Sequence, residues 1–480
     1  MAGGLIQLIA VGQIDTFLSI NPQLSFYQYV YKRHSYFAME SRRLEFSTQP
    51  SLNNQVYSSF ECVVGRHGDL LSEIYFCFTL PNIYSSNKYR FKWIKQIGNI
   101  FVKKATIKVG DIEIDSLTGE WMHIWNELSL PENDKRTDEM LGNVQELYDP
   151  KLSHNRVTIR NNQFIYYYYP ESSPSTTDVQ PPSIKSREII VPLRFWFTKN
   201  PALSLPLLRL QGHEIKIYIE TEKVENLYQV YVDDLKCYVS PWFFNNRLYP
   251  NNKIEFRNFV KNEASFAIQP YIEANYILLD QEERYTLFRK GTLSYLVEQL
   301  KVQNVELQNI ESMKTVDISV NLPTKEIIWT IKRNDVNLFN EWTNYTMDIP
   351  ESNRGILKSG QIIFNNNART DEKPAQYFNI IQTYKYHTRV PKQGIYCYSF
   401  ALFPEKEFIS GYYNACIIKS SLLVYLNADN NNIVFNNLLS KKFNITEPNI
   451  NYNMNIYCSC YNMFEIIGNQ VSMKFTISRG

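Results

Sequence analysis

Acidic side chains cluster once in a pattern that could perform catalysis. The run Asp280-Gln-Glu-Glu-Arg284 holds three carboxylates at short spacing, and a pair of carboxylates can serve as acid and base in glycoside hydrolysis. The same run is also a helix start, because Asp280 can cap the first turn and the two glutamates suit the positive end of a helix dipole. We favour the helix start and predict no catalytic residue here.

Other catalytic and nucleotide-binding signatures are missing from the chain. No Gly-x-Ser-x-Gly sequence marks a nucleophile elbow. Gly3-Gly4 and the Gly65-x-x-Gly68 spacing match neither glycine-rich nucleotide fingerprint. The six histidines are scattered without metal-ligand spacing. We therefore expect no enzyme activity, no catalytic, cofactor-binding or metal-binding residue, and no cofactor.

The cysteine pattern indicates reduced thiols. The seven cysteines are few and odd in number, and most lie in apolar, strand-like runs, which is typical of a cytosolic setting. Cys458-Ser-Cys460 is too closely spaced for CxxC redox chemistry. The cysteines are Cys62, Cys77, Cys237, Cys397, Cys416, Cys458 and Cys460.

Tryptophans could form platforms on which sugars stack. Most of the seven lie inside apolar periodic runs, where packing in the core is the expected role. They are Trp93, Trp121, Trp125, Trp196, Trp242, Trp329 and Trp342.

The composition indicates a large β-rich globular protein. The 480 residues are 44% hydrophobic and 20% charged, with 34 Tyr and 28 Phe against only 17 Gly, and aromatic residues favour strands. At roughly 150 residues per domain the length would suggest about three domains, but two large β units fit as well. The formal net charge is +2 and no basic run exceeds a pair, which argues against direct nucleic-acid binding. No apolar run approaches the roughly 18 residues of a membrane span, so we expect a soluble or peripheral protein.

Alternating hydrophobicity predicts strands over most of the chain. Residues 105–115 form a hairpin with its turn at Gly110-Asp111, and residues 471–477 form a final strand. Further strands are predicted over residues 73–80, 187–197, 213–220 and 228–239. Before them, Asn21-Pro22 reads as a helix start, and apolar residues recur at helical spacing from Phe26 to Phe37, which predicts a short amphipathic helix.

Proline and asparagine clusters divide the chain. A hinge is predicted at residues 240–252, between two strand-rich halves. This gives an amino-terminal arm over residues 1–24, a first unit over 25–240 and a second unit over 241–480. Residues 169–183, 365–373 and 427–437 are expected to form exposed loops.

Ordered segments along nearly the whole chain point to one family. In the first half they are Gly3-Gly-Leu-Ile-Gln-Leu-Ile-Ala-Val-Gly12, Asn21-Pro22-Gln23, Val30-Tyr-Lys-Arg-His34, Phe37-Ala38, Gly68-Asp-Leu70, Leu80-Pro81, Ile114-Asp115, Gly119-Glu-Trp121, Ile124-Trp-Asn-Glu-Leu128, Leu141-Gly-Asn-Val144, Val191-Pro-Leu-Arg-Phe-Trp-Phe197, Asn200-Pro-Ala-Leu-Ser-Leu-Pro-Leu-Leu208 and His213-Glu214. In the second half they are Leu279-Asp-Gln-Glu-Glu-Arg284, Tyr295-Leu-Val-Glu-Gln-Leu300, Pro323-Thr-Lys-Glu-Ile-Ile-Trp329, Gly394-Ile-Tyr-Cys-Tyr-Ser-Phe-Ala-Leu402 and Pro404-Glu405. Together these segments resemble the major capsid proteins of the nucleocytoplasmic large DNA viruses.

The resemblance implies an all-β fold and a structural function. It implies a double jelly roll, that is, two eight-stranded antiparallel sandwiches with a few short helices, which trimerises into a pseudo-hexagonal capsomer of an icosahedral shell. The implied partners are two further copies, neighbouring capsomers, minor capsid and penton proteins, and the inner viral membrane through the amino-terminal arm. The implied location is the virion, with assembly in the host cytoplasm.

Two other functions are compatible with the residues. One is a paralogous minor capsid or assembly-scaffold protein of the same fold. The other is a carbohydrate-binding jelly-roll protein, for which exposed tryptophans or carboxylates would have to meet in a cleft.

Overall fold

The computed structural model describes most of the chain. The described residues are 3–13, 19–23, 25–27, 29, 31–48, 52, 58–132, 134–153, 169–173, 180–262, 266–307, 313–427, 451–468 and 470–475.

The first half is a sandwich of two antiparallel sheets, each with a main path of four strands. One sheet has the order β1 (Phe37–Glu45), β12 (Tyr271–Leu279), β3 (Leu70–Leu80) and β7 (Arg187–Pro192), with β8 (Leu205–Pro206) beside β3. The other has the order β2 (Ser58–Val63), β9 (Ile215–Thr221), β5 (Val102–Val109) and β6 (Ile112–Thr118). In β9, Ile215, Ile217 and Ile219 are buried and alternate with half-buried residues, because successive side chains of a strand point to opposite faces.

The second half repeats this arrangement. Its larger sheet has the order β13 (Thr292–Leu307), β22 (Tyr452–Ile467), β15 (Pro323–Arg333) and β19 (Ile395–Ser399), with β20 (Tyr413–Asn414) and β23 (Gln470–Met473) at its margins. The facing sheet has the order β14 (Met313–Ile318), β21 (Ser420–Leu426), β16 (Leu357–Phe364) and β17 (Asn367–Ala368), with β18 (Lys373–Pro374) beside β16. The two four-stranded paths of each half give eight strands per sandwich, which is the double jelly roll expected from the sequence.

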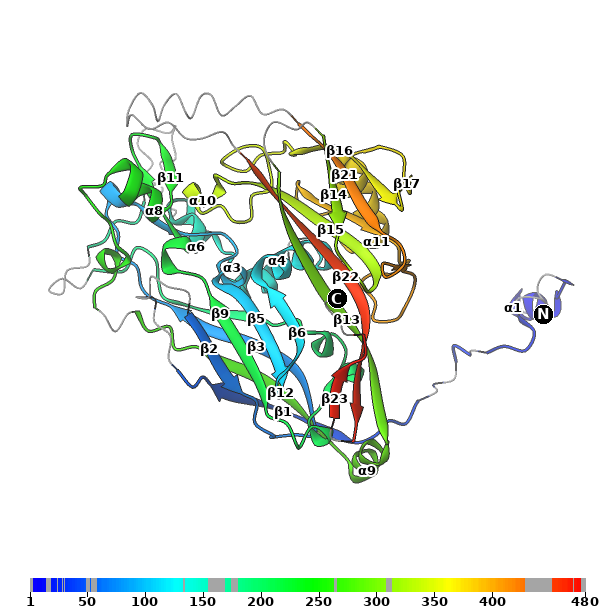
Figure 1. The fold of residues 1–480 in the computed structure, drawn as a ribbon. Helices are drawn as coiled ribbons and strands as arrows, with labels where there is room; N and C mark the ends of the chain where they lie inside the picture. Colours follow the sequence, from blue (N-terminus) through cyan, green and yellow to red (C-terminus); the bar gives the residue numbers. More distant parts are fainter. Residues whose placement is uncertain are drawn as a thin grey trace.

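Short helices and one small sheet complete the fold. The small sheet consists of β11 (Cys237–Val239), β10 (Tyr228–Val232) and β4 (Phe91–Trp93). The helices are α1 (Gly3–Ile9), α3 (Ile97–Phe101), α4 (Gly119–Ser129), α5 (Lys135–Met140), α6 (Gln145–Tyr148), α7 (Pro150–Ser153), α8 (Pro241–Phe243), α9 (Gln281–Arg289), α10 (Val336–Phe339) and α11 (Gln382–Tyr386). The two sandwiches lie side by side with α4 between them (Figure 1).

Most predicted strands are confirmed, with some changes of length. The hairpin at residues 105–115 is β5 and β6, joined at Gly110, whose φ of 59° suits a tight turn. Residues 228–239 form two short paired strands, β10 and β11, instead of one. The strand predicted over residues 187–197 ends at Pro192. Of the final strand, residues 471–473 belong to β23, and residues 476–477 lie outside the described residues.

The helix predicted between Asn21-Pro22 and Phe37 is wrong for the residues that the structure describes. Residues 31–36 have no regular structure, and β1 begins at Phe37 and pairs with β12 along its whole length. Asn21 has a φ of 51°, which is not the extended conformation of a helix cap. Tyr27 and Tyr31 are exposed, and a short amphipathic helix without a packed face is not stable.

The predicted loops and hinge have different outcomes. Residues 365–369 are exposed, and Asn365 and Asn366 have positive φ values of 47° and 64°, as a tight hairpin turn requires. Parts of the other two loops, residues 174–179 and 428–437, lie outside the described residues. Residues 241–248 form α8 and a π-helical turn, and Phe243, Phe244 and Leu248 pack into the core of the first half.

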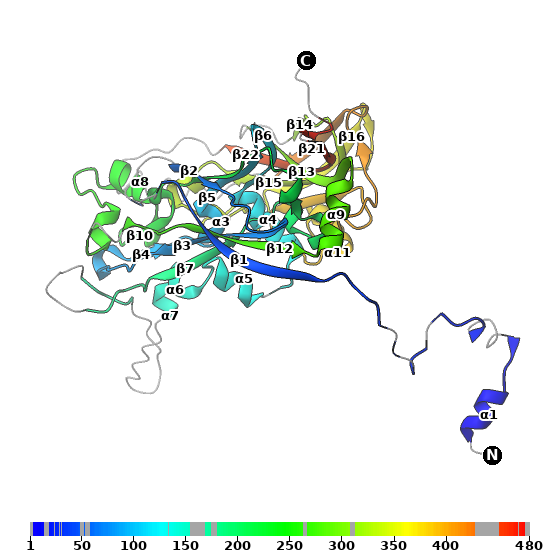
Figure 2. The ribbon, with the colours of Figure 1, turned by 90° about the horizontal axis from the view of Figure 1, so that it is seen from below.

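Strand β12 bears on the division of the chain. It lies beyond the boundary predicted between residues 240 and 241, yet it is hydrogen-bonded on one side to β1 and on the other to β3. We therefore propose a boundary near residue 280, where β12 ends and α9 begins. In Figure 2, α1 and the other described residues before β1 extend away from the body of the molecule.

Candidate functional site: the buried face between the two jelly rolls

The acidic run weighed as a catalytic pair is a helix start. The Asp280 side chain accepts a hydrogen bond of 2.8 Å from the Glu283 backbone N–H, so it caps α9. Arg284 in the same helix pairs with the buried Asp69 at 2.7 Å, and Asp69 also accepts from the Leu279 N–H at 2.9 Å. These contacts fix α9 to the first jelly roll and confirm the capping interpretation.

Tryptophans and cysteines lie mainly in the core, as predicted. Trp93, Trp196 and Trp329 are fully buried, Trp121 and Trp125 are nearly so, and Trp242 is 45% exposed. All seven cysteines are free thiols, and five of them are buried. The predicted residues therefore assemble no sugar-binding platform among the described residues.

Strand β15 separates the second core from the first jelly roll. Ile327, Trp329 and Ile331 pack in the core of the second jelly roll, whereas Ile328 belongs to the cluster that extends from the first. A β-bulge lies between Thr324 and Glu326 in the pairing with β22. A bulge re-aims the side chains beside it. The buried Lys325 pairs with Glu298 of β13 and lies 5.9 Å from the centre of the Trp125 ring of α4.

Helix α4 fills the space between the two sandwiches. Thr118 caps it by accepting from the Trp121 N–H at 3.3 Å. The Trp121 ring stacks on Tyr457 of β22 with centroids 5.4 Å apart, and Trp125 meets the His387 ring edge-on at 6.2 Å. The helix is thus buried on the side that faces the second jelly roll as well as on its own side.

Polar side chains of α4 also reach the second jelly roll. Glu120 pairs with Lys332 at 2.9 Å and accepts from the Asn455 side chain at 3.0 Å. At the other end of the helix, Glu127 pairs with Arg389 at 3.0 Å, and the Arg389 N–H donates to the Leu128 carbonyl at 3.0 Å. Each pair joins one half of the chain to the other.

A second charged group lies nearby and consists of Lys199, Glu298 and Lys325. Glu298 is 2.5 Å from Lys199 and also pairs with the fully buried Lys325. Burial alone would raise the pKa of Glu298, but the two ammonium groups hold it below its ordinary value. Burial lowers the pKa of Lys325 more than Glu298 raises it. The carboxylate is therefore ionised and pairs with both ammonium groups.

Asp115 is a buried carboxyl group at the same interface. Its oxygens accept from the Trp196 N–H at 2.9 Å and the Ser116 N–H at 2.8 Å. Burial nevertheless raises the pKa of Asp115 to about 7, although these bonds and Lys199 act in the opposite direction. Between about pH 4 and pH 7 the folded chain thus binds a proton at Asp115 that the unfolded chain releases.

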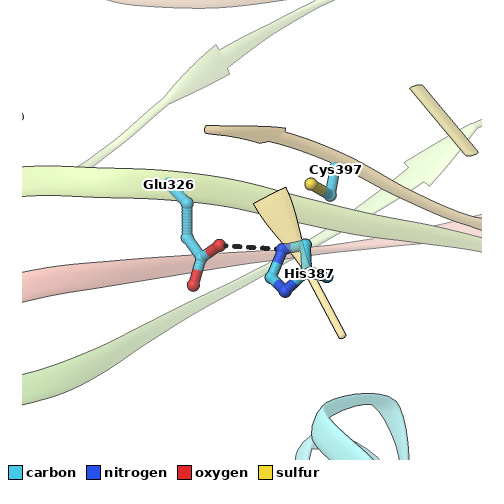
Figure 3. A group of neighbouring side chains, drawn as sticks. All are labelled: Glu326, His387 and Cys397. Atoms are coloured by element: carbon cyan, nitrogen blue, oxygen red, sulfur yellow. Dashed lines mark ion pairs between the residues drawn. The ribbon is translucent and has the colours of Figure 1, made fainter. Parts of the chain in front are cut away.

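His387 lies between two carboxylates. Its Nε2 is 3.2 Å from Glu326 and its Nδ1 is 3.1 Å from Glu405. Burial would lower the pKa of His387, but Cys397 and the two glutamates raise it well above the ordinary value. Figure 3 shows Glu326, His387 and Cys397 directed toward one another.

The interface supports a structural role. Its charged groups are buried or half-buried and paired with one another, which holds the two jelly rolls in a fixed relation. Sequence reasoning missed Glu326, His387 and Lys325, because their partners come from distant segments. The available signal was the Lys325-Glu326 pair directly before the apolar run Ile327-Ile-Trp329, since charged residues are rarely buried unless they are paired.

Apolar side chains are exposed in two places. The amino-terminal arm presents Leu8 and Ile9, and the segment after it presents Phe26 and the fully exposed Tyr27. In the second jelly roll, six exposed apolar residues lie between residues 402 and 417, and we call them the apolar patch: Leu402, Phe403, Phe408, Ile409, Tyr412 and Ile417. Within the described ranges, no helix has the length and apolar character needed to cross a bilayer.

Comparisons with known proteins agree with this architecture. The family described as "Major capsid protein N-terminus" matches residues 25–280, and the family described as "Large eukaryotic DNA virus major capsid protein" matches residues 283–471. The major capsid protein of Phaeocystis pouchetii virus is 27% identical, over 88% of this chain and 92% of the relative. That of Pyramimonas orientalis virus is 28% identical, over 90% of this chain and 94% of the relative.

A solved structure shows the same fold. The quasi-atomic structure of the PBCV-1 virus capsid has a TM-score of 0.62 at 20% identity and covers 94% of this chain and 100% of its own. The family matches meet between residues 280 and 283, where β12 gives way to α9. These relatives are structural shell proteins and not enzymes. The chain therefore belongs to the family of major capsid proteins of large eukaryotic DNA viruses.

Proposed function

We propose that this chain is a subunit of an icosahedral virion shell and that three copies form a pseudo-hexagonal capsomer. The observation that carries the proposal is the buried face between the jelly rolls. Because α4 and its ion pairs join the two sandwiches, each chain contributes two similar lobes in a fixed relation. Three chains around a threefold axis then present six lobes, which suits tiling by hexagons.

The apolar patch of the second jelly roll supports contact with a second copy. Its six members lie within residues 402–417, and the rings of Phe403 and Phe408 are 6.0 Å apart. Exposed apolar clusters on a soluble chain mark interaction surfaces. We propose that this patch is part of the contact between subunits of the trimer.

Light scattering and charge substitution test the trimer together. The purified chain is expected at three times 56.6 kDa, about 170 kDa. The double variant Phe403→Glu and Phe408→Glu is expected to remain monomeric, because it places two charges in a desolvated contact. Met313→Glu changes an equally exposed residue of β14 and serves as the control. A wild-type chain that stays monomeric at high concentration would count against the capsomer and favour a minor shell component.

The amino-terminal arm is proposed to dock on minor capsid proteins beneath the capsomer. Residues 1–24 contain no lysine or arginine and a single acidic residue, Asp15. An arm without basic residues lacks the attraction to anionic lipid that peripheral membrane segments use. A protein partner with an apolar groove therefore fits the arm better than the inner membrane does.

Deletion of residues 1–24 tests the arm. We expect trimers of normal mass that fail to retain minor capsid proteins or to close a shell. Flotation of the wild-type chain with anionic vesicles, lost on deletion, would show a membrane contact instead. Normal shells from the deleted chain would contradict a docking role. Contacts with neighbouring capsomers and penton proteins, and assembly in the host cytoplasm, belong to the same proposal.

A further inference from the structure

Three potential metal ligands meet behind the sheet of the second jelly roll. Glu326 lies on β15, Cys397 on β19, and His387 directly after α11 (Figure 3). Their ligand atoms all lie within 4.8 Å of one another, and all three residues are buried. Cys397 pairs with Ile328 across the sheet, and Ile328 lies two residues from Glu326 along β15. Glu326 and Cys397 are therefore diagonal neighbours on one face of the sheet.

Several polar atoms of this cluster lack a hydrogen-bond partner. In the described part of the chain, neither carboxylate oxygen of Glu326 makes a hydrogen bond, and neither does the Nε2 atom of His387. The two side chains nevertheless form an ion pair. A buried carboxylate without hydrogen bonds is costly. These atoms therefore point to a ligand that they share.

The other nitrogen of His387 is held as in many metal sites. His387 Nδ1 lies 3.1 Å from Glu405 Oε1. Glu405 is in turn fixed by the Thr388 N–H at 2.9 Å and the Thr388 hydroxyl at 2.5 Å. A ligating histidine typically donates its second N–H to a carboxylate, which orients the ring and makes the first nitrogen a better ligand. In this geometry, Nε2 is directed to Glu326.

We propose that Glu326, His387 and Cys397 bind one divalent metal ion, with Zn²⁺ as the best fit. One oxygen, one imidazole nitrogen and one thiolate sulfur form a mixed set that zinc accepts in tetrahedral geometry, and water can supply the fourth ligand. A metal binds the thiolate of Cys397 and a free lone pair on His387 Nε2, so binding competes with protons at these two atoms.

A groove lies beside this cluster, next to two residues that contact His387. It has a volume of about 390 Å³ and is lined by residues of both halves, including Trp125 and Glu405. Trp125 contacts the His387 ring edge-on, and Glu405 is its hydrogen-bond partner. Bound metal would join β15, β19 and the segment after α11, next to the face that packs on α4. The inference does not depend on trimer formation.

Metal content of the purified full-length chain tests the proposal. The chain is incubated with ZnCl₂ and desalted, and its zinc content is measured by elemental mass spectrometry. We expect about one zinc ion per chain. Cys397→Ala should lose this zinc. Cys77→Ala removes another buried thiol, in β3, and should keep it. Glu405→Gln should weaken zinc binding by about 10- to 100-fold without abolishing it.

A second measurement works on the unchanged chain, so a folding defect in a variant cannot obscure the result. Cobalt(II) in place of zinc should give a thiolate-to-metal charge-transfer band in the near ultraviolet and the visible bands of a tetrahedral site. Wild-type chain with no more zinc than Cys397→Ala, or cobalt bound without the charge-transfer band, would overturn the proposal. Zinc retained by Cys397→Ala would do the same.

Discussion

The indole of Trp121 stacks on the phenol ring of Tyr457 with 5.4 Å between centroids and 30° between planes. Trp121 belongs to α4 of the first jelly roll and Tyr457 to β22 of the second. The contact lies beside the ion pair of Glu120 with Lys332. One helix of the first half thus supplies aromatic and charged contacts to the larger sheet of the second half. These contacts explain why two sandwiches can act as one shell subunit.

Trp121→Ala should destabilise the whole chain. Removal of a buried tryptophan typically costs about 3–5 kcal/mol through lost burial and the cavity that remains. Urea unfolding followed by tyrosine and tryptophan fluorescence measures the change. Trp242→Ala removes a half-exposed ring and should cost less than about 1 kcal/mol. Equal effects of the two substitutions would show that α4 does not join the halves.

Glu298→Gln should leave a buried cation without compensation. Lys325 is fully buried and depends on Glu298, whereas Lys199 is 25% exposed and can be hydrated. Breaking a buried pair from one side costs about 3–5 kcal/mol. Adding Lys325→Met should restore part of the lost stability, because it removes the uncompensated charge.

The matched control is an exposed ion pair of the first jelly roll. Lys216 pairs with Glu214 at 3.2 Å on the surface, and Glu214→Gln should change the free energy of unfolding by less than about 1 kcal/mol. A loss of that small size for Glu298→Gln, or no recovery with Lys325→Met, would contradict the assigned compensation.

Asp115 should make stability depend on pH between about 4 and 7. Its pKa rises from 3.8 to about 7 on burial, so between these values the folded state binds more protons than the unfolded state. Stability is then greatest at low pH and decreases as pH rises through this window, by about 1.4 kcal/mol per pH unit for this group. Above pH 7 the loss is complete.

Asp115→Asn isolates this contribution. Urea unfolding at pH 5, 6 and 7 gives the difference in stability between wild type and variant, which cancels the titration of the other groups. The free energy of unfolding of the wild type, minus that of the variant, should decrease as pH rises. Parallel pH profiles for the two chains would mean that Asp115 is ionised throughout.

Local patterns predicted the fold well where one face of a strand is buried. Strand β9 and the hairpin of β5 and β6 alternate as the sequence requires, and Asp280 caps α9 as its position suggests. The apolar spacing from Phe26 to Phe37 misled, because helical periodicity stabilises a helix only if that face packs. Strand β12 was missed as part of the first half, since sheet partners more than 190 residues away leave no local signal.

The interface was less predictable than the strands. The partners of Lys325 are set by a bulge in β15, which no propensity reveals. Glu326, His387 and Cys397 have no ligand spacing in the sequence, and only the pairing of β15 with β19 brings two of them together. Family resemblance predicted the architecture, but these residue-level contacts required the three-dimensional structure.

Gly119→Ala should be among the most damaging single substitutions in the chain. Gly119 starts α4, and a Cβ there would lie 2.0 Å from the Asn99 carbonyl oxygen and 2.3 Å from that of Val102. Both neighbours are backbone atoms of α3 and β5, so relief requires α4 to move away from the first sandwich. Such a movement would also displace Trp121 from Tyr457, so we expect a loss of stability above about 3 kcal/mol, as for severe overpacking.

Gly291→Ala is the control. It adds the same methyl group where no atom lies within 4 Å and should be neutral within about 0.5 kcal/mol. Thermal unfolding and the yield of soluble protein measure both variants. Wild-type behaviour of Gly119→Ala would mean that α4 does not approach α3 and β5 this closely.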